Sequence, residues 1–215
     1  MNSVAVVVIC LILGQAAHSK PSLHNTESWK TLEIAVGGAK PYKPSSTSWQ
    51  ADDTTIFVGI SAFRDKRCGQ TLKSLFLNAE HPDRITVGVI EHIHTENDNS
   101  IRCMRAYCSA MGANPGSGKP CPHENQITVM DVSFLDARGP GMTRVLQENL
   151  LKDEEFCIQV DAHSKFVKNW DTVAMSEWGK TANEYGIISS VPPDVRMMDK
   201  RVDEMNHVCQ ATFTR

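Results

Sequence analysis

Residues 54–90 read TTIFVGISAFRDKRCGQTLKSLFLNAEHPDRITVGVI, and this stretch decides the fold class. The β-branched and aromatic residues at 54–60 predict a strand. The next apolar residues recur at helical spacing: Leu72, Leu75, Phe76 and Ala79. Pro82 then breaks the helix, and a second apolar run at 85–90 predicts another strand. Together these features predict a βαβ unit whose two strands are parallel.

The same alternation continues toward the C-terminus. Strands are predicted at 127–132, 156–160 and 187–191, with helices at 142–150 and 170–185 between them. Residues 91–125 are rich in His, Asn, Pro and Gly, so they are predicted to be an ordered loop insertion. Alternating strands and helices predict an α/β fold with a Rossmann-like, mostly parallel sheet flanked by helices.

Length and charge narrow the class of protein. With 215 residues the chain is expected to hold one main domain. A formal net charge of −3 provides no basic excess for a phosphate backbone, so nucleic acid is not expected as a partner.

The N-terminal segment resembles a secretory signal peptide. Residues 1–19 contain no Lys, Arg, Asp or Glu, and their apolar run at 4–13 is shorter than the roughly 20 residues that span a bilayer. Residues 20–53 are polar and rich in Pro, Gly and Ser, which predicts a flexible stem before a domain at 54–215. We therefore expect a secretory-pathway protein, in the ER or Golgi lumen or secreted, without a membrane span after signal cleavage.

The cysteines fit an oxidising compartment. Signal cleavage would remove Cys10 and leave six: Cys68, Cys103, Cys108, Cys121, Cys157 and Cys209. Disulfides are expected, although six cysteines allow fifteen pairings and the sequence does not choose among them. The cluster at 103–121 suggests a locally stapled loop, and Cys157 lies in an apolar strand where it is expected to be buried. The alternative is a structural zinc site made by Cys103, Cys108, Cys121 and His123.

Polar residues follow two of the predicted strands, where open parallel sheets bind ligands. After the first strand come Ser61, Arg64 and Asp65; Arg64 is suited to a phosphate and Asp65 to a ribose or base. After the fourth come Asp161, Ala162 and His163. Residues two apart in an extended segment face the same way, so Asp161 and His163 are expected to project together. A carboxylate and an imidazole suit Mn²⁺ or a similar divalent metal.

Several spaced motifs resemble one enzyme family. Residues 156–163, FCIQVDAH, are followed by Phe166-Val167 and Trp170-Asp171. Upstream lie Ser61-x-x-Arg64-Asp65 and Gly139-Pro140-x-x-x-Arg144. In this order, over residues 54–191, the motifs resemble the glycosyltransferases that add N-acetylglucosamine to hydroxyproline of a ubiquitin-ligase adaptor.

The resemblance implies a GT-A fold, a UDP-N-acetylglucosamine donor, a protein or glycan acceptor and a metal, expected to be Mn²⁺. It places Asp161 and His163 on the metal, and Ser61, Arg64, Asp65 and Asp161 at the nucleotide sugar. Asp161 and Arg144 are the expected catalytic residues, because a metal and an Arg neutralise the charge that develops on the departing diphosphate. It also implies retention of the sugar's anomeric configuration.

Three departures qualify the resemblance. Ala162 stands where such enzymes commonly have Ser, the signal peptide makes a cytosolic acceptor unsuitable, and the sequence ends at Arg215, before the expected acceptor-binding region and third metal ligand. The late candidate for that ligand is His207.

Two alternatives stay open: an enzyme like the polypeptide N-acetylgalactosaminyltransferases, which also use Asp-x-His, and a secreted protein that keeps the donor-site fold without catalysis. Trp170 and Trp178 are expected in the core, and His92 and His94 are interpreted as solvated loop residues.

Overall fold

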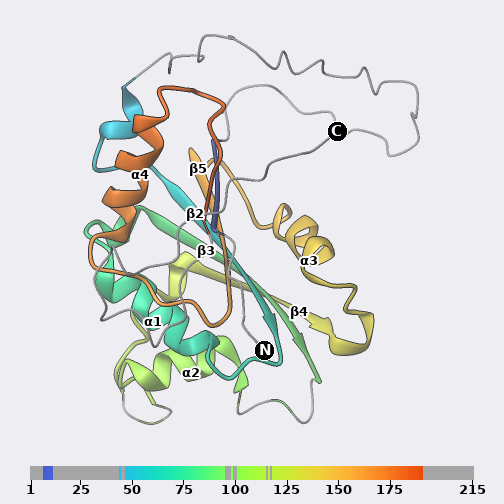
Figure 1. Cartoon of the computed structure of the whole chain (residues 1–215). Helices are drawn as coiled ribbons and strands as arrows, with labels where there is room; N and C mark the ends of the chain where they lie inside the picture. The colour runs from blue at the N-terminus through green and yellow to red at the C-terminus, as the bar shows by residue number, and fades with distance from the viewer. Residues whose placement is uncertain are drawn as a thin grey trace, which may run out of the picture.

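The protein is built on a mixed β-sheet with helices on both faces (Figure 1). The computed structural model describes residues 44, 47–94, 98, 101–114, 116 and 118–190, together with the backbone of residues 7–11. Within this part of the chain the sheet has six strands in the order β4-β3-β2-β5-β1-β6. The α/β fold with a mostly parallel central sheet, predicted from the sequence, is confirmed.

The predicted βαβ unit forms the centre of the sheet. Strand β2 (Ile56–Phe63) leads into helix α1 (Cys68–Asn78), and β3 (Ile85–Ile93) returns parallel to β2. A short 3-10 helix at Pro82–Arg84 connects α1 to β3. Strand β4 (Ile127–Ser133) adds parallel to β3, and β5 (Phe156–Asp161) adds parallel to β2 on the other side. Four parallel strands therefore end at the same edge.

The two remaining strands lie beyond β5. Strand β1 (Val7–Leu11) runs antiparallel to both β5 and β6 (Ile188–Ser190). Strand β1 falls within the predicted signal peptide, whose cleavage stays a prediction. None of the helices among the described residues combines the length and apolar character that a membrane crossing requires.

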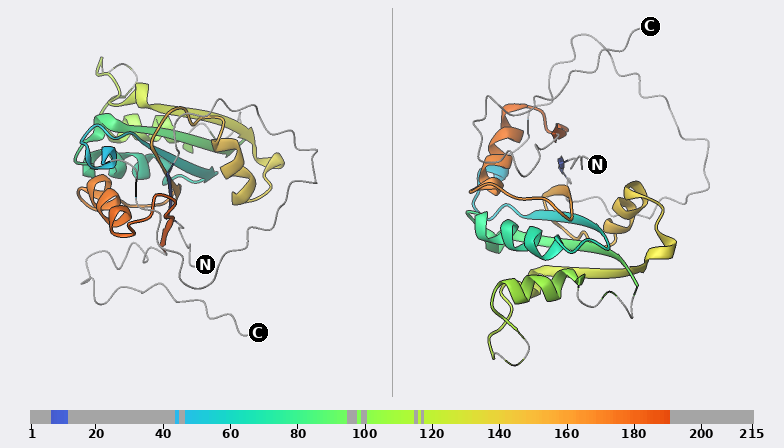
Figure 2. Two further views of the ribbon diagram at one scale, coloured as in Figure 1. Left: turned by 90° about the horizontal axis from the view of Figure 1, so that it is seen from above. Right: turned by 60° about the horizontal axis from the view of Figure 1, so that its bottom comes forward.

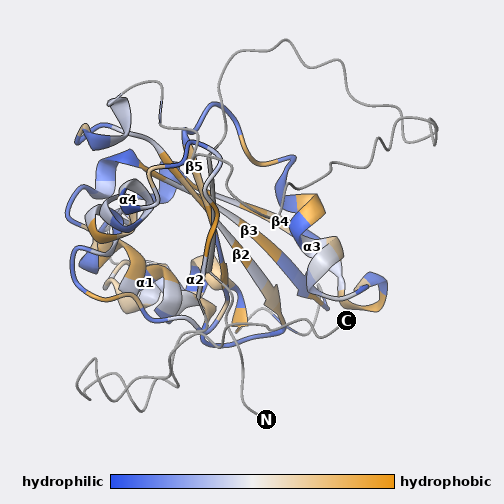
Figure 3. Ribbon diagram, turned by 45° about the horizontal axis from the view of Figure 1, so that its top comes forward, coloured by the Kyte–Doolittle hydropathy of each residue, from blue (hydrophilic) through white to orange (hydrophobic). Residues whose placement is uncertain are grey.

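The helices form two unequal layers, as Figures 1 and 2 show. Helices α1, α2 (Cys103–Ala110) and α4 (Trp170–Lys180) bury their apolar side chains with one face of the strands. Helix α3 (Pro140–Gln147) lies on the opposite face, against β2 and β3. Apolar residues concentrate on the central strands (Figure 3).

Strand alternation separates the core from the functional face. In β2 the core side chains are Ile56, Val58, Ile60 and Ala62. Because successive strand residues point to opposite faces, Gly59 and Ser61 face α3 instead. A Cβ on Gly59 would lie only 2.7 Å from the Gln147 amide oxygen, so a larger residue there would force the Gln147 side chain to shift.

The predicted loop insertion at 91–125 is wrong in two respects. Strand β3 extends to Ile93, and residues 103–110 form helix α2. Two disulfides hold this segment in a regular structure. Cys68–Cys103 joins the start of α1 to the start of α2, and Cys108–Cys121 closes the loop that follows α2. The zinc alternative is therefore wrong, because its three thiols are oxidised. Cys157 is buried, as expected.

The predicted stem ends against the core. Ser48–Gln50 form a 3-10 helix, and the ring of Trp49 meets that of Trp178 at a centroid distance of 5.6 Å. The Thr54 hydroxyl donates to the Ser48 carbonyl over 2.6 Å. The domain boundary at residue 53 stays a prediction.

The Trp170-Asp171 pair of the sequence motif has a structural role. The Trp170 indole donates to the Leu75 carbonyl over 2.9 Å. Asp171, with no exposed surface, accepts from the amides of Glu80 and His81 at 2.8 and 3.0 Å and from Arg84 at 2.9 Å. Burial alone would raise the pKa of Asp171, but these hydrogen bonds outweigh it and hold the pKa below its usual range. Trp170 therefore attaches α4 to α1, and Asp171 attaches it to the turn between α1 and β3.

Replacing Asp171 with alanine should lower the free energy of unfolding by about 3–5 kcal/mol, because it leaves Arg84 charged, buried and unpaired. Denaturant unfolding followed by circular dichroism measures this change. The control is Asp83→Ala in the same turn, an exposed carboxylate whose loss should cost less than about 0.5 kcal/mol.

The pH dependence has a defined sign. Since the folded pKa of Asp171 is depressed, its stabilisation is complete above the unfolded value of about 3.9 and is lost as pH falls through the folded pKa. An equal stability deficit of Asp171→Ala at neutral and at strongly acidic pH would contradict this role.

Candidate functional site

A cavity of about 530 Å³ opens at the carboxyl ends of the parallel strands, on the α3 side of the sheet. Its sheet side is lined by polar and aromatic residues of β2, β3 and β5 and of the turns after them: Ser61, Phe63, Asp65, His92, Asp161 and His163. The start of α3 forms the facing wall with Ala137, Gly139, Pro140 and Thr143. A cavity of this size accommodates a small organic ligand.

Strand pairing brings these side chains together. In the parallel register Ser61 lies beside Asp161, and Phe63 lies beside His92. Ala162 is buried in the core on the other face, with 2% of its surface exposed. Asp161 and His163 therefore project into the same cavity, as their spacing in an extended segment predicts.

Asp161 and His163 form a pair suited to a shared cation. The distance from His163 Nε2 to Asp161 Oδ2 is 3.9 Å, too long for a hydrogen bond. This separation is shorter than the sum of two metal–ligand distances of about 2.1 Å each, so one ion can bind both atoms at once. His163 Nε2 is also buried, and it makes no hydrogen bond to the described part of the chain. A buried nitrogen in this condition is available to a ligand.

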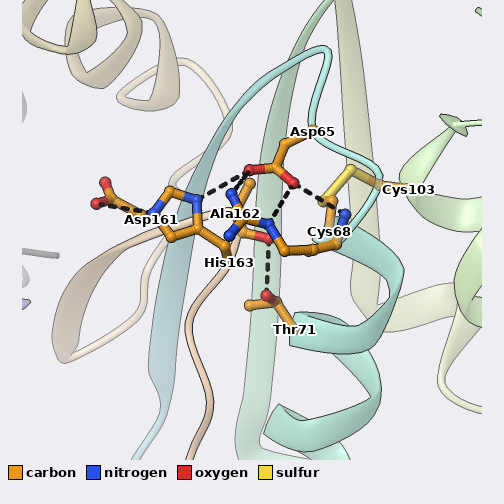
Figure 4. A network of polar contacts seen from close by, with 8 residues as sticks. Asp65, Cys68, Thr71, Cys103, Asp161, Ala162 and His163 are labelled. Atoms are coloured by element: carbon orange, nitrogen blue, oxygen red, sulfur yellow. Dashed lines mark hydrogen bonds and ion pairs between the residues drawn. A yellow bond between two sulfur atoms is a disulfide. The ribbon is translucent and has the colours of Figure 1, made fainter. Parts of the chain in front are cut away.

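Asp65 holds the other side of the same imidazole (Figure 4). Its Oδ2 lies 2.9 Å from His163 Nδ1. Arg67 donates to Asp65 from its backbone amide and from its guanidinium, at 2.9 to 3.0 Å. Burial raises the pKa of Asp65, but the hydrogen bonds from Arg67 and His163 lower it by more. The net result is a pKa below the usual value. Asp65 is therefore an ionised acceptor beside the pair.

Helix α1 fixes the loop that carries His163. Three polar residues on one helical face, spaced 71, 74 and 78, reach this loop. The Thr71 hydroxyl donates to the Ala162 carbonyl over 2.8 Å (Figure 4). Ser74 Oγ accepts from the Phe166 amide at 2.9 Å, and the Asn78 side chain donates to the Phe166 carbonyl at 3.1 Å. The Phe166-Val167 segment of the sequence motif is thus held by backbone hydrogen bonding to α1.

Arg64 lies near the cavity but does not line it. Its backbone is left-handed, with φ of 46°, and its guanidinium bonds both carboxylate oxygens of Asp98 at 2.8 and 2.9 Å. The guanidinium carbon stands 5.3 Å from the centre of the Phe134 ring. The hydrogen bond to Asp98 raises the pKa of Arg64, and Arg64 in turn lowers the pKa of Asp98. A phosphate contact by Arg64 stays a prediction.

Arg144 is half-buried on α3 and is absent from the cavity lining, so its catalytic role also stays a prediction. Pro140 and Thr143 are the residues of α3 that line the cavity, and the side-chain amide of Gln147 on the same helix donates to Ser61 Oγ over 3.3 Å. The Gln147 amide oxygen is buried without a partner among the described residues. The apolar residues that predicted this helix do not form its inward face: Met142 and Val145 are exposed, whereas Thr143 and Gln147 are the buried residues of α3.

His92 is the second residue that the sequence did not reveal. Interpreting it as a solvated loop histidine is wrong: it lies on β3, is 4% exposed and lines the cavity. Burial lowers the pKa of His92, which favours its neutral form. His94 follows the strand and is half-buried. Trp170 and Trp178 are in the core as expected, whereas His207 lies outside the described residues.

The protein thus combines an α/β fold, built on a mostly parallel sheet, with a cavity at the carboxyl edge of the parallel strands. A family model described as Glycosyltransferase (GlcNAc) matches residues 55–115 and 92–215, which together make up more than half of the chain. The chain belongs to this glycosyltransferase family. The narrower resemblance to hydroxyproline-modifying enzymes stays a prediction.

Among solved structures, the chain is similar to the mannosyltransferase PcManGT from Pyrobaculum calidifontis in complex with GDP-Man and Mn²⁺. The sequence identity is 13% and the TM-score is 0.39. The match covers 57% of this chain and 31% of the other, so the chain spans about a third of the length of that structure. No curated protein matches the chain.

Replacing Ser74 with alanine should weaken the attachment of the His163 loop to α1 by about 1 kcal/mol, because the Phe166 amide loses its acceptor. Hydrogen exchange read by mass spectrometry should show faster exchange at residue 166 with core strands unchanged. The exposed neighbour Gln70→Ala serves as control on the same helix. Equal exchange at 166 in all three proteins would contradict this attachment.

Proposed function

We propose that this protein transfers N-acetylglucosamine from UDP-N-acetylglucosamine to a hydroxyl of a protein or glycan, with a divalent metal, Mn²⁺ by preference, held by Asp161 and His163. The proposal rests chiefly on one observation: a buried, unpartnered His163 Nε2 lies 3.9 Å from an Asp161 oxygen inside the cavity. Membership of the glycosyltransferase family supports the class of reaction.

The donor set fits such a metal. One carboxylate oxygen and one imidazole nitrogen suit Mn²⁺ and similar ions. Among the described residues no group of three or more His, Cys, Asp or Glu side chains is arranged around a common point. Two protein ligands leave coordination positions for water and a diphosphate, which is what a donor-binding metal requires. When bound, the ion would neutralise charge on the diphosphate.

The remaining side chains have defined positions for binding the donor. In the proposed reaction the bond between the sugar C1 and the β-phosphate oxygen breaks and UDP leaves with its electron pair, while C1 bonds to the acceptor oxygen and the acceptor proton is released to solvent. Ser61 and Thr143 line the cavity; the Ser61 hydroxyl accepts from Gln147 and the Thr143 hydroxyl donates to the Gly139 carbonyl over 3.2 Å. Arg64 and Arg144 lie outside the lining, and Arg64 must exchange its Asp98 partner to meet a phosphate. This exchange would couple donor binding to the position of Asp98.

Calorimetric titration of UDP should show binding with Mn²⁺ that disappears in EDTA. The double variant Asp161→Ala with His163→Ala should weaken this binding by more than about 100-fold, since residues that merely orient a metal ligand are already worth about 10–100-fold. Asp136→Asn, an exposed carboxylate next to the lining residue Ala137, is the matched control and should bind as the wild type does.

Three results would count against the proposal. UDP binding that is indifferent to EDTA and to the double variant would remove the metal site. Binding of UDP without release of sugar from either UDP-N-acetylglucosamine or UDP-N-acetylgalactosamine would favour the non-catalytic alternative. Preferential turnover of the second donor would favour an enzyme like the polypeptide N-acetylgalactosaminyltransferases.

A further inference from the structure

Asp65 has a different set of contacts from the one its sequence position predicts. A residue reserved for a ribose or a base should offer a free carboxylate oxygen to the cavity. Instead, Oδ1 accepts from the amide and Nε of Arg67, and Oδ2 accepts from Arg67 Nη2 and faces His163 Nδ1 at 2.9 Å. Both oxygens are therefore engaged within the protein.

The contact with His163 decides which nitrogen of the ring carries the proton. An ionised carboxylate only accepts hydrogen bonds, so Nδ1 must be the donor. In the neutral ring Nε2 then has the free lone pair. Nε2 is the buried atom without a partner, and it is directed toward Asp161 Oδ2 (Figure 4). Metal-ligating histidines generally donate their second ring nitrogen to a carboxylate or carbonyl in this way.

We propose that Asp65 is a positioning residue that holds His163 in the Nδ1–H tautomer, with Nε2 directed at the metal site, rather than a contact for the nucleoside. This inference rests on the proposed function for its metal. The arrangement of Asp65 and His163 is independent of any ligand, so it can be tested separately.

Arg67 makes Asp65→Asn an informative substitution. If the Asn oxygen replaces Oδ1, it keeps the bonds from the Arg67 amide and Nε, and the new NH₂ group faces His163 and Arg67 Nη2. The opposite orientation would lose two bonds from Arg67 instead of one. The favoured orientation therefore donates to His163 Nδ1, moves the ring proton to Nε2 and blocks the lone pair that would bind the metal.

The first measurement is the tautomer of His163 in the metal-free, full-length protein, read from two-bond ¹H–¹⁵N correlations of the imidazole. The wild type should show Nδ1–H, and Asp65→Asn should show Nε2–H. His163→Gln assigns the signal. Arg67→Ala is the matched variant: it removes the other side-chain partner of Asp65 but leaves the bond to His163, so Nδ1–H should persist.

The second measurement is Mn²⁺ affinity, followed by the loss of the free-ion signal in electron paramagnetic resonance, with and without UDP. Asp65→Asn should weaken Mn²⁺ binding about 10–100-fold. At saturating Mn²⁺ its UDP affinity should return to within about threefold of the wild type, since Asp65 does not touch the nucleotide in this arrangement. Asp136→Asn controls for the loss of one negative charge near the cavity.

The outcomes separate the two proposals. An Nδ1–H tautomer in Asp65→Asn, with unchanged Mn²⁺ affinity, overturns the positioning role and leaves the metal site intact. UDP binding that stays weak at saturating Mn²⁺, with normal Mn²⁺ affinity, identifies Asp65 as a nucleotide contact and also overturns it. A wild type that binds no Mn²⁺ with UDP present overturns the proposed function itself.

Discussion

The register in which β2 pairs with β5 is the constraint on which the rest of the site depends. It places Ser61 beside Asp161, and parallel pairing with β3 places Phe63 beside His92. A slip of one residue would turn every one of these side chains to the opposite face, so the core would be lost together with the cavity. The apolar side chains of β2 enforce this register, because burying Val58, Ile60 and Ala62 leaves the alternate positions to face α3.

Helix α1 fixes the segments that surround the site. At its start, the Cys68–Cys103 disulfide ties it to α2, three residues after Asp65. Along one face, Thr71, Ser74 and Asn78 bond the chain that follows β5. Beyond its end, Asp171 of α4 binds the turn that leads into β3. The helix therefore holds both segments that meet at the imidazole of His163, and the motif residues after His163 contribute to stability more than to chemistry.

Much of the architecture follows from local patterns. The strands at 56–63, 85–93 and 156–161 have dense β-branched or apolar composition, and their helices show clear periodicity, so each element is specified by near neighbours in the chain. Helix α2 could not be predicted in this way. It is only eight residues long and lies in a stretch rich in His, Asn, Pro and Gly, and two disulfides together with the burial of Tyr107 keep it ordered. Polar composition was mistaken there for irregular structure.

The sequence by itself determined the fold class, the position of Asp161 and His163 at a strand end, and their common direction, because strand alternation is a property of consecutive residues. Only the tertiary structure decided what each polar group does. Asp65 meets His163 across 98 positions, and Gln147 meets Ser61 across 86. No local pattern encodes such a pair, since a carboxylate after a strand is equally suited to a helix cap, a nucleoside or an imidazole, and only folding selects the partner.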